Sequence, residues 1–274
     1  MTAKCFASRM THSPLPVFTP PRFQSLRTIF ALMLREMSTT YGRSPGGYLW
    51  VILEPVGAVV LLSFAFSIVL RAPSLGTSFV LFYATGFLPF SAFMSLNGKL
   101  TKSLRFSRSL LAYPRVTWLD AILARYILAL LTEITVFCIV ITGILLFQET
   151  RAVITIGPIL ISLSMVAVAG AGVGLMNCLL NGLFPVWGRI WSIISRPLFL
   201  ASGVFFLYED MPQLAQDILW WNPLLHAVGE MRRGFYPIYE ASYVSYTYTF
   251  GTGAVLILLG LILISRHHKR IIEN

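Results

Sequence analysis

The chain has 274 residues, of which 56% are hydrophobic and only 12% charged, whereas soluble domains carry about 25% charged residues. So few polar groups could not cover the surface of a water-soluble fold, and the composition predicts an integral membrane protein. The formal net charge is +10, but the basic residues lie between apolar runs and not on one folded face, which argues against nucleic-acid binding.

The N-terminal segment up to residue 21 has no apolar core of a secretory signal and carries four prolines, so we expect a disordered cytoplasmic tail over residues 1–20. Residues 21–40 then show apolar side chains at helical spacing, with Arg27 and Arg35 on the opposite side. This pattern predicts an amphipathic helix on the membrane surface. A simple anchor explains the pattern equally well.

Six apolar stretches could cross the bilayer, which takes roughly 20 helical residues for about 30 Å of hydrocarbon. They lie at residues 49–70, 79–96, 126–147, 153–180, 190–207 and 248–265. The fifth is the weakest because Arg196 and Pro197 interrupt it. The sequence therefore predicts an all-α membrane protein, with a lead-in at 21–48, a transmembrane domain at 49–265 and a cytoplasmic tail at 266–274.

Basic residues are distributed unequally between the loops. If the N-terminus is inside, most Lys and Arg residues fall on the cytoplasmic side and most acids fall outside. Because short cytoplasmic loops are enriched in Lys and Arg, this asymmetry predicts six crossings with both termini in the cytoplasm.

Two acids lie inside predicted spans. Glu54, followed by Pro55, is in the first span and Glu133 is in the third. A carboxylate in hydrocarbon costs on the order of 3 kcal/mol, so each should face protein, water or a partner. Both a functional role and hydrogen bonding between helices fit this requirement. In the fourth span, Gly170 and Gly174 favour close helix packing.

The loop over residues 97–118 carries Lys99, Lys102, Arg105, Arg108 and Arg115 with leucines interleaved. Its pattern allows a short amphipathic helix that docks into a partner. Periodicity alone favours the simpler interpretation, in which the charges mark only the cytoplasmic side.

The outer segment over residues 208–248 is rich in aromatic residues and proline, including Trp220, Trp221 and Tyr236. Such residues normally form the interfacial belt of a membrane protein, although they could also stack on sugar rings. Together with Arg196-Pro197 they suggest broken or re-entrant helices, which are tolerated only where they are buried in protein or line a cavity.

The sequence has no G-x-x-x-x-G-K-[ST] phosphate loop and no cluster of catalytic acids or histidines at one membrane face. We therefore expect no enzyme activity and no cofactor in this chain. If transport is driven by ATP, another chain binds the ATP and magnesium.

Several motifs resemble those of ABC-2 type polysaccharide export permeases. The approach to the first span (Gly47-Tyr48-Leu49-Trp50 through Glu54-Pro55) and Gly86-Phe87-Leu88-Pro89-Phe90 in the second are similar to the family's. Tyr113-Pro114-Arg115, and Trp221-Asn222-Pro223 with Glu230, Arg232 and Tyr236-Pro237, resemble its capsule-export branch.

This resemblance implies a homodimer in the bacterial inner membrane with the type V exporter fold, paired with two cytoplasmic ABC ATPase subunits. The cargo would be a lipid-linked acidic capsular polysaccharide, passed on to a periplasmic co-polymerase-like protein and an outer-membrane channel. The helix at 21–40 becomes an interface helix and the segment at 208–248 a re-entrant outer gate. The coupling helix would contact the ATPase through Leu100, Leu104, Arg108, Leu110 and Leu111.

We further expect the polymer to contact basic, acidic and aromatic side chains along its path: Arg35, Arg43, Trp50, Glu54, Arg125, Trp220, Trp221 and Tyr236. Three alternatives remain. The same machine could carry O-antigen, teichoic acid or a small molecule. An ion-driven secondary transporter could use Glu54 and Glu133, although no inverted repeat is visible. A membrane glycolipid transferase would need catalytic acids or histidines clustered at one membrane face, and this sequence has no such cluster.

Overall fold

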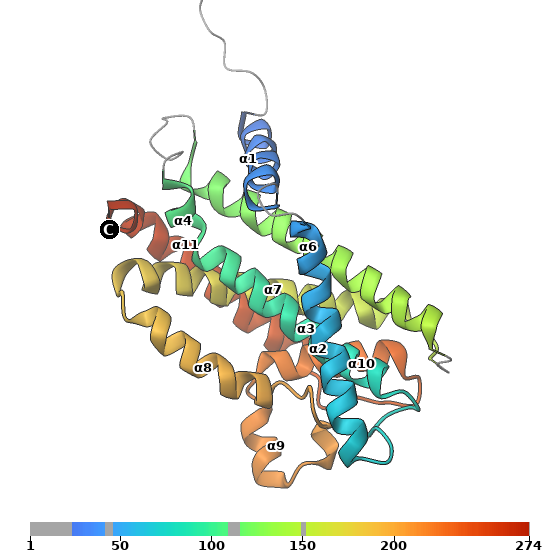
Figure 1. Ribbon diagram of the computed structural model, residues 1–274. Helices are drawn as coiled ribbons and strands as arrows, with labels where there is room; N and C mark the ends of the chain where they lie inside the picture. The colour runs from blue at the N-terminus through green and yellow to red at the C-terminus, as the bar shows by residue number, and fades with distance from the viewer. Residues whose placement is uncertain (1–23, 42–45, 109–115, 149–151, 274) are drawn as a thin grey trace, which may run out of the picture.

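The computed structural model describes residues 24–41, 46–108, 116–148 and 152–273, and within these all regular secondary structure is helical (Figure 1). The predicted tail at 1–20 lies outside the described residues. In chain order the helices are α1 (Gln24–Tyr41), α2 (Gly47–Val69), α3 (Phe79–Thr101), α4 (Ser103–Phe106), α6 (Trp118–Phe147), α7 (Ile156–Leu183), α8 (Trp187–Ala201), a 3-10 turn (Tyr208–Asp210), α9 (Gln213–Leu219), α10 (Pro223–Phe235) and α11 (Tyr246–Glu273).

Five of the described helices, α2, α3, α6, α7 and α11, are long and apolar enough to cross a membrane. They coincide with the first four predicted spans and the sixth. The fifth predicted span differs, because it forms only the 15 residues of α8, a length of about 22 Å at 1.5 Å per residue. Gly203, with φ of 77°, turns the chain just after this helix.

α3 and α7 form the centre of the bundle. In their most apolar windows 67% and 61% of residues are buried, against 17–22% for α2, α6 and α11. A Cβ added at Gly170 would lie 3.0 Å from the Cβ of Leu96, and one at Gly174 would lie 2.8 Å from that of Leu100. The predicted role of these two glycines in close helix packing is therefore confirmed.

α11 packs against the other side of α7 through further glycines. Gly253 lies against Val168, and Gly260 lies against Leu175. Because contacting positions rise together along both helices, α7 and α11 run parallel. The chain must therefore travel back along the bundle between residues 183 and 246, although this stretch contains no helix of spanning length.

Gly172→Ala is expected to destabilise the protein by about 1–3 kcal/mol, because overpacking displaces neighbouring groups. Its new Cβ would meet the Gly253 carbonyl oxygen at 2.9 Å and the Leu256 Cβ at 2.8 Å. Gly143→Ala in α6 is the matched control, since a Cβ there meets nothing within 4 Å. Thermal unfolding in detergent compares the two variants, and equal melting temperatures would contradict this account of the α7–α11 contact.

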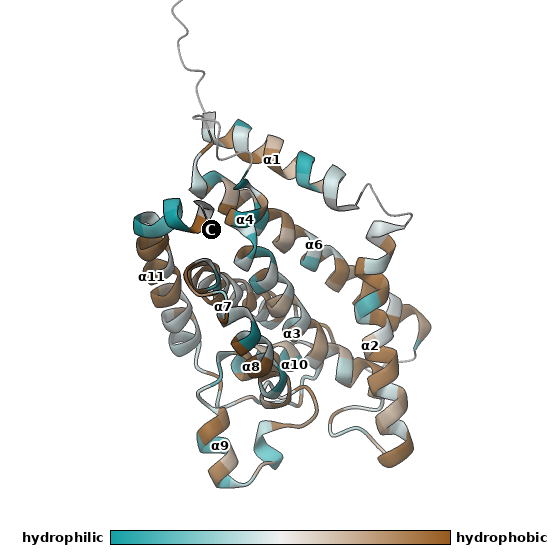
Figure 2. Cartoon of the chain, turned by 60° about the vertical axis from the view of Figure 1, so that its left-hand side comes forward, coloured by the Kyte–Doolittle hydropathy of each residue, from teal (hydrophilic) through white to brown (hydrophobic). Residues whose placement is uncertain are grey.

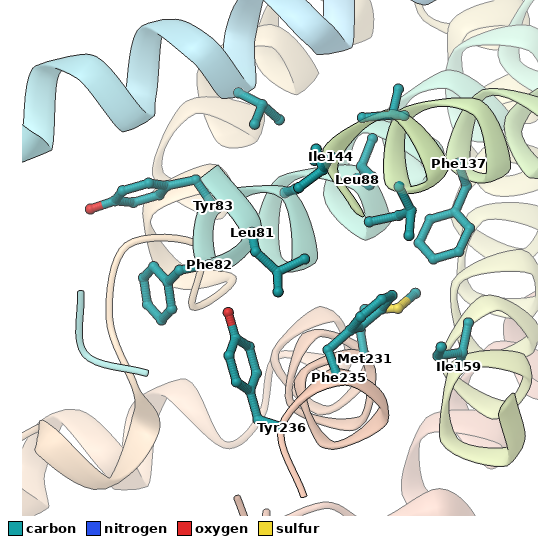
Figure 3. Close-up of a cluster of buried hydrophobic side chains, with 14 of the residues drawn as sticks. Leu81, Phe82, Tyr83, Leu88, Phe137, Ile144, Ile159, Met231, Phe235 and Tyr236 are labelled. Carbon is teal, nitrogen blue, oxygen red and sulfur yellow. The ribbon is translucent and has the colours of Figure 1, made fainter. Parts of the chain in front are cut away.

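The two ends of the bundle differ (Figure 2). We call one the α1 end, which holds α1, α4 and the polar C-terminal part of α11, and the other the α9 end, which holds α9 and the last turn of α2. At the α9 end a hydrophobic cluster joins α3, α6, α7 and α10 (Figure 3), with Phe82, Phe137, Ile159 and Phe235 among its members. This cluster gives α10 its place inside the protein.

Candidate functional site

At the α1 end, a buried ion pair fastens α1 to α6. Nε of Arg125 donates to Oε1 of Glu36 at 2.8 Å, and both side chains are only 8% exposed. The Arg125 guanidinium also lies 4.1 Å from the centre of the Phe106 ring. α6 begins at a capping box formed by Thr117 and Asp120, which fixes where Arg125 falls on the helix.

The rest of α1 agrees with the predicted amphipathic helix. Leu26, Phe30 and Leu34 remain exposed, as expected for an apolar side that rests in a membrane surface. Arg35 is exposed. Arg43, which we also predicted in the polymer path, lies outside the described residues.

A cavity of about 370 Å³ lies beneath α1, between α2, α3 and α6. It collects five charged side chains: Glu36, Glu54, Lys99, Arg125 and Glu133. The sequence analysis considered Glu54 and Glu133 separately, each as an acid inside a predicted span. The structure brings both to one cavity together with Arg125. Sequence reasoning gave no role to Glu36 or Lys99 here. An acid on the otherwise apolar inner side of α1 was the available signal for Glu36.

The predicted coupling residues divide into three groups. Leu100 and Leu104 are 1% and 0% exposed and belong to a core cluster with α7 and α11, so they can support this segment from within but offer no surface to a partner. Arg108 is exposed. Leu110 and Leu111 lie outside the described residues.

A buried amide bridge near the same end links three helices. Nδ2 of Asn177 donates to Oδ1 of Asn97 at 2.8 Å, and Nε1 of Trp187 donates to Oδ1 of Asn177 at 2.8 Å. This bridge joins α3, α7 and the start of α8. Sequence analysis missed it because single asparagines in apolar runs carry no periodic signal.

At the α9 end, α10 is held inside the protein by polar contacts. Ser162 Oγ donates to the Ala227 carbonyl oxygen at 2.6 Å, and the Thr155 N–H donates to that of Gly234 at 2.8 Å. Both contacts tie α10 to the beginning of α7.

Arg232 on α10 is 1% exposed and organises the chain that leaves α8. Its Nη1 donates to the Phe206 carbonyl oxygen at 2.8 Å and its Nη2 to that of Val204 at 3.1 Å. The guanidinium lies 4.3 Å from the centre of the Phe82 ring. A single arginine thus positions irregular backbone against α3.

The predicted aromatic contacts differ in how accessible they are. Trp221 is 67% exposed, whereas Trp220 is half-buried and donates its Nε1–H to the Tyr243 carbonyl oxygen at 3.2 Å. Tyr236 is buried in the cluster of Figure 3, and its ring fills the space beside Gly76. At the α1 end, Trp50 is 66% exposed. Contact of any of these residues with a polymer stays a prediction.

His226 on α10 is fully buried and accepts the Ser245 N–H at Nδ1, at 3.3 Å. Its Nε2 lies 2.8 Å from the Trp220 carbonyl oxygen, so Nε2 carries the proton of a neutral ring. Burial lowers the pKa of His226. Since this group binds protons less readily in the folded state, it reduces stability as pH falls below its unfolded value of about 6.5.

We expect the melting temperature of the wild-type protein to fall between pH 7.5 and pH 5. The melting temperature of His226→Gln should fall less over the same interval. The glutamine keeps a polar side chain but takes up no proton. Thermal unfolding of both proteins across this pH range tests the expectation. An unchanged slope in the variant would show that other groups set the pH dependence.

Comparison with known proteins shows which family this chain resembles. The family profile described as ABC-2 type transporter matches residues 27–236, which run from α1 to the end of α10. The match therefore includes α2, α3, α6 and α7, four of the five described helices of spanning length.

Named relatives share nearly the same extent. The chain is 28% identical over 236 residues to the polysialic acid transport protein KpsM of Escherichia coli, which covers 86% of this chain and 92% of that protein. It is 27% identical over 244 residues to the capsule polysaccharide export inner-membrane protein BexB of Haemophilus influenzae, covering 89% and 92%. It is 30% identical over 249 residues to the protein of the same description, CtrC, of Neisseria meningitidis serogroup B, again covering 89% and 92%. With the profile spanning most of the described helices, this chain belongs to the ABC-2 type transporter family.

Proposed function

We propose that this chain is the membrane-spanning permease subunit of an ATP-driven exporter that moves lipid-linked acidic capsular polysaccharide out of the cytoplasm. The observation that carries the proposal is the extent of similarity to capsule-export proteins, which covers 86–89% of this chain and 92% of theirs. Hydrolysis of ATP belongs to a separate subunit, with ATP and magnesium bound there.

Six crossings with both ends in the cytoplasm fit the packing. α7 and α11 run parallel, so one further passage is needed between them, and α8 with the irregular chain up to α10 supplies it. α1 and the basic C-terminal turn of α11 share the α1 end, which the positive-inside tendency assigns to the cytoplasm. α9 and α10 then form the outer gate.

The homodimer gives α8 a role. None of its residues is buried, and Arg189, Ser192 and Arg196 fall on one exposed side of the helix. Charged side chains at membrane depth normally face water or a partner and not lipid. A second copy facing this side would enclose a hydrated path between the two subunits, and the arginines would line it for an anionic polymer. Arg35, Trp50 and Trp221 would be exposed near the two ends of that path.

The first test of the proposal is isolation of the full chain from native membranes under mild detergent. We expect an ABC ATPase to co-purify, and we expect deletion of the gene to leave capsular polymer inside the cell. Surface polymer that continues to appear when ATP hydrolysis in that ATPase is blocked would favour the ion-driven alternative. Accumulation of a different lipid-linked glycan would change the cargo and leave the exporter in place.

Arg108→Glu is expected to weaken co-purification of the ATPase about tenfold or more. An ATPase surface that pairs with Arg108 is acidic, and a glutamate at this position would repel it. Arg71→Glu is the matched control, because Arg71 is exposed just after α2 at the opposite end. The ratio of ATPase to permease in the purified complex measures the effect. Equal ratios for the two variants would remove this segment from the ATPase contact.

A further inference from the structure

Another cavity lies at the α1 end, where α4, the end of α7, the start of α8 and the end of α11 meet. Its volume is about 260 Å³, and its lining includes Lys102, Arg105, Asn181 and Ile271. None of the described residues that line it is an acid. Because both basic side chains are exposed, the cavity presents positive charge to any ligand that enters it.

The wall opposite the basic side chains is neutral and polar. Asn181 is half-buried, and its amide can both donate and accept hydrogen bonds. Gly188 lies against it, and a Cβ added there would be 2.9 Å from Oδ1 of Asn181, so this glycine leaves room beside the amide. The volume is below the range of about 300–1,000 Å³ typical of sites that enclose a whole drug-sized ligand. The cavity therefore suits a small anionic group that carries hydroxyls.

The exposed side of α11 changes from apolar to basic on approaching this cavity. Leu258 and Ile262 are exposed, and so are Arg266 and Arg270. Because residues four apart lie on the same side of a helix, these four form one row along α11, whose polar end is visible in Figure 2. Basic side chains near the end of a spanning helix reach the headgroup region of the bilayer. Ile271, which follows Arg270, lines the cavity, so the cavity lies at the depth of lipid headgroups.

We propose that this cavity binds the headgroup of an anionic phospholipid of the phosphatidylglycerol class. The phosphate lies beside Lys102 and Arg105, the glycerol hydroxyls bond to the Asn181 amide, and the acyl chains follow the exposed apolar row of α11. Basic pockets between transmembrane helices are typical sites for anionic headgroups. The bound lipid is a resident of the fold, and the proposal does not rest on which glycan is exported.

To test the lipid class, the full chain is reconstituted in bilayers with equal amounts of phosphatidylglycerol, phosphatidylethanolamine and phosphatidylcholine. Native mass spectrometry then identifies the lipids that it retains. We expect phosphatidylglycerol to be retained most, because an ethanolamine or choline group would bring a positive charge toward Lys102 and Arg105. Equal retention of the three lipids, or a preference for either zwitterionic lipid, would overturn the proposal.

Arg105→Gln is expected to lower retention of phosphatidylglycerol about fivefold, and Lys102→Gln/Arg105→Gln about thirtyfold, as for one and two basic side chains beside an anionic headgroup. Both positions are exposed, so the variants should fold, and their melting temperatures check this. Arg27→Gln is the matched control, since Arg27 is an exposed basic residue of α1 at the same end but outside the cavity. An equal loss in Arg27→Gln and Arg105→Gln would replace the site with general attraction to a basic surface.

Soluble glycerol 3-phosphate has the phosphate and hydroxyls without the acyl chains, and it distinguishes a lipid from a free phosphate compound. We expect it to compete with phosphatidylglycerol only at a large excess. Competition at equal concentration would overturn the lipid as the source of this chemistry.

A cytoplasmic partner with an acidic surface is the competing occupant of Lys102 and Arg105. If Lys102→Gln/Arg105→Gln retains phosphatidylglycerol as the wild type does but loses co-purification of the ATPase, the two residues belong to that contact and the lipid proposal is wrong. Capsule export is measured separately, so a variant that loses the lipid and still exports polymer leaves the proposed function in place.

Discussion

Glu36→Gln is expected to lower the free energy of unfolding by about 3–5 kcal/mol, because removing one partner of a buried ion pair leaves an uncompensated buried charge. The charge left behind is the Arg125 guanidinium, whose side chain is 8% exposed. α1 should then separate from α6, exposing the cavity. Chemical unfolding in detergent, followed by tryptophan fluorescence, measures the loss.

The double variant Glu36→Gln/Arg125→Met separates charge from packing. It removes both charges, and a buried pair replaced by apolar residues is often neutral in stability. We therefore expect it to recover most of the loss seen in Glu36→Gln alone. Arg35→Gln is the neighbouring control, since an exposed surface position normally changes stability within about 0.5 kcal/mol. A double variant as unstable as the single one would mean that shape, and not charge, holds α1.

Arg232→Met is expected to destabilise the α9 end by about 2–5 kcal/mol. It leaves the carbonyl oxygens of Val204 and Phe206 without their donors, at about 1–3 kcal/mol for each buried acceptor. Hydrogen exchange of residues 202–207 should rise well above wild type, and export should fall with it. Arg232→Lys keeps the charge but cannot bond both carbonyls in the same forked geometry, so it should recover only part of the loss.

The adjacent arginine provides the matched control. The Arg233 side chain is 50% exposed, and its Nη1 lies 3.5 Å from Oε2 of Glu230. The Glu230 side chain is only 1% exposed, so losing Arg233 costs stability where α10 meets the start of α11. Because both carbonyl bonds of Arg232 remain, Arg233→Met should still leave hydrogen exchange at 202–207 unchanged. A similar effect from both arginines would show that net charge at this end matters more than the two carbonyl contacts.

Hydropathy and helical period were enough to predict the five long helices, the amphipathic α1 and the close packing at Gly170 and Gly174. They could not rank the helices by burial. α3 and α2 are both apolar along their length, yet α3 is central and α2 peripheral. Which apolar helix lies inside depends on tertiary packing, because lipid and protein interior select the same side chains.

The site was predictable only in parts. Glu54 and Glu133 stood out because charge is rare in spans, and Arg125 was expected near the cytoplasmic mouth of the polymer path. The sequence could not show that α2 and α6 bring the three residues to one cavity. Leu100 and Leu104 were predicted to contact an ATPase from the family resemblance, since the pattern of leucines and basic residues alone favoured a simpler interpretation. Their burial against α7 and α11 follows from contacts far along the chain. The fifth span was misjudged in length, because a turn at Gly203 carries no hydropathy signal.

α7 is 28 residues long, about 42 Å at 1.5 Å per residue, and both of its ends are fastened to other helices. Asn177 holds it to α3 and α8 near one end, and Ser162 holds it to α10 near the other. Its glycines leave almost no clearance against α3 and α11, so it has little freedom to bend or slide on its own. A displacement imposed beside α4 would therefore reach α10 as rigid-body movement of three parallel helices, with mechanical work done at one face of the membrane delivered to the other.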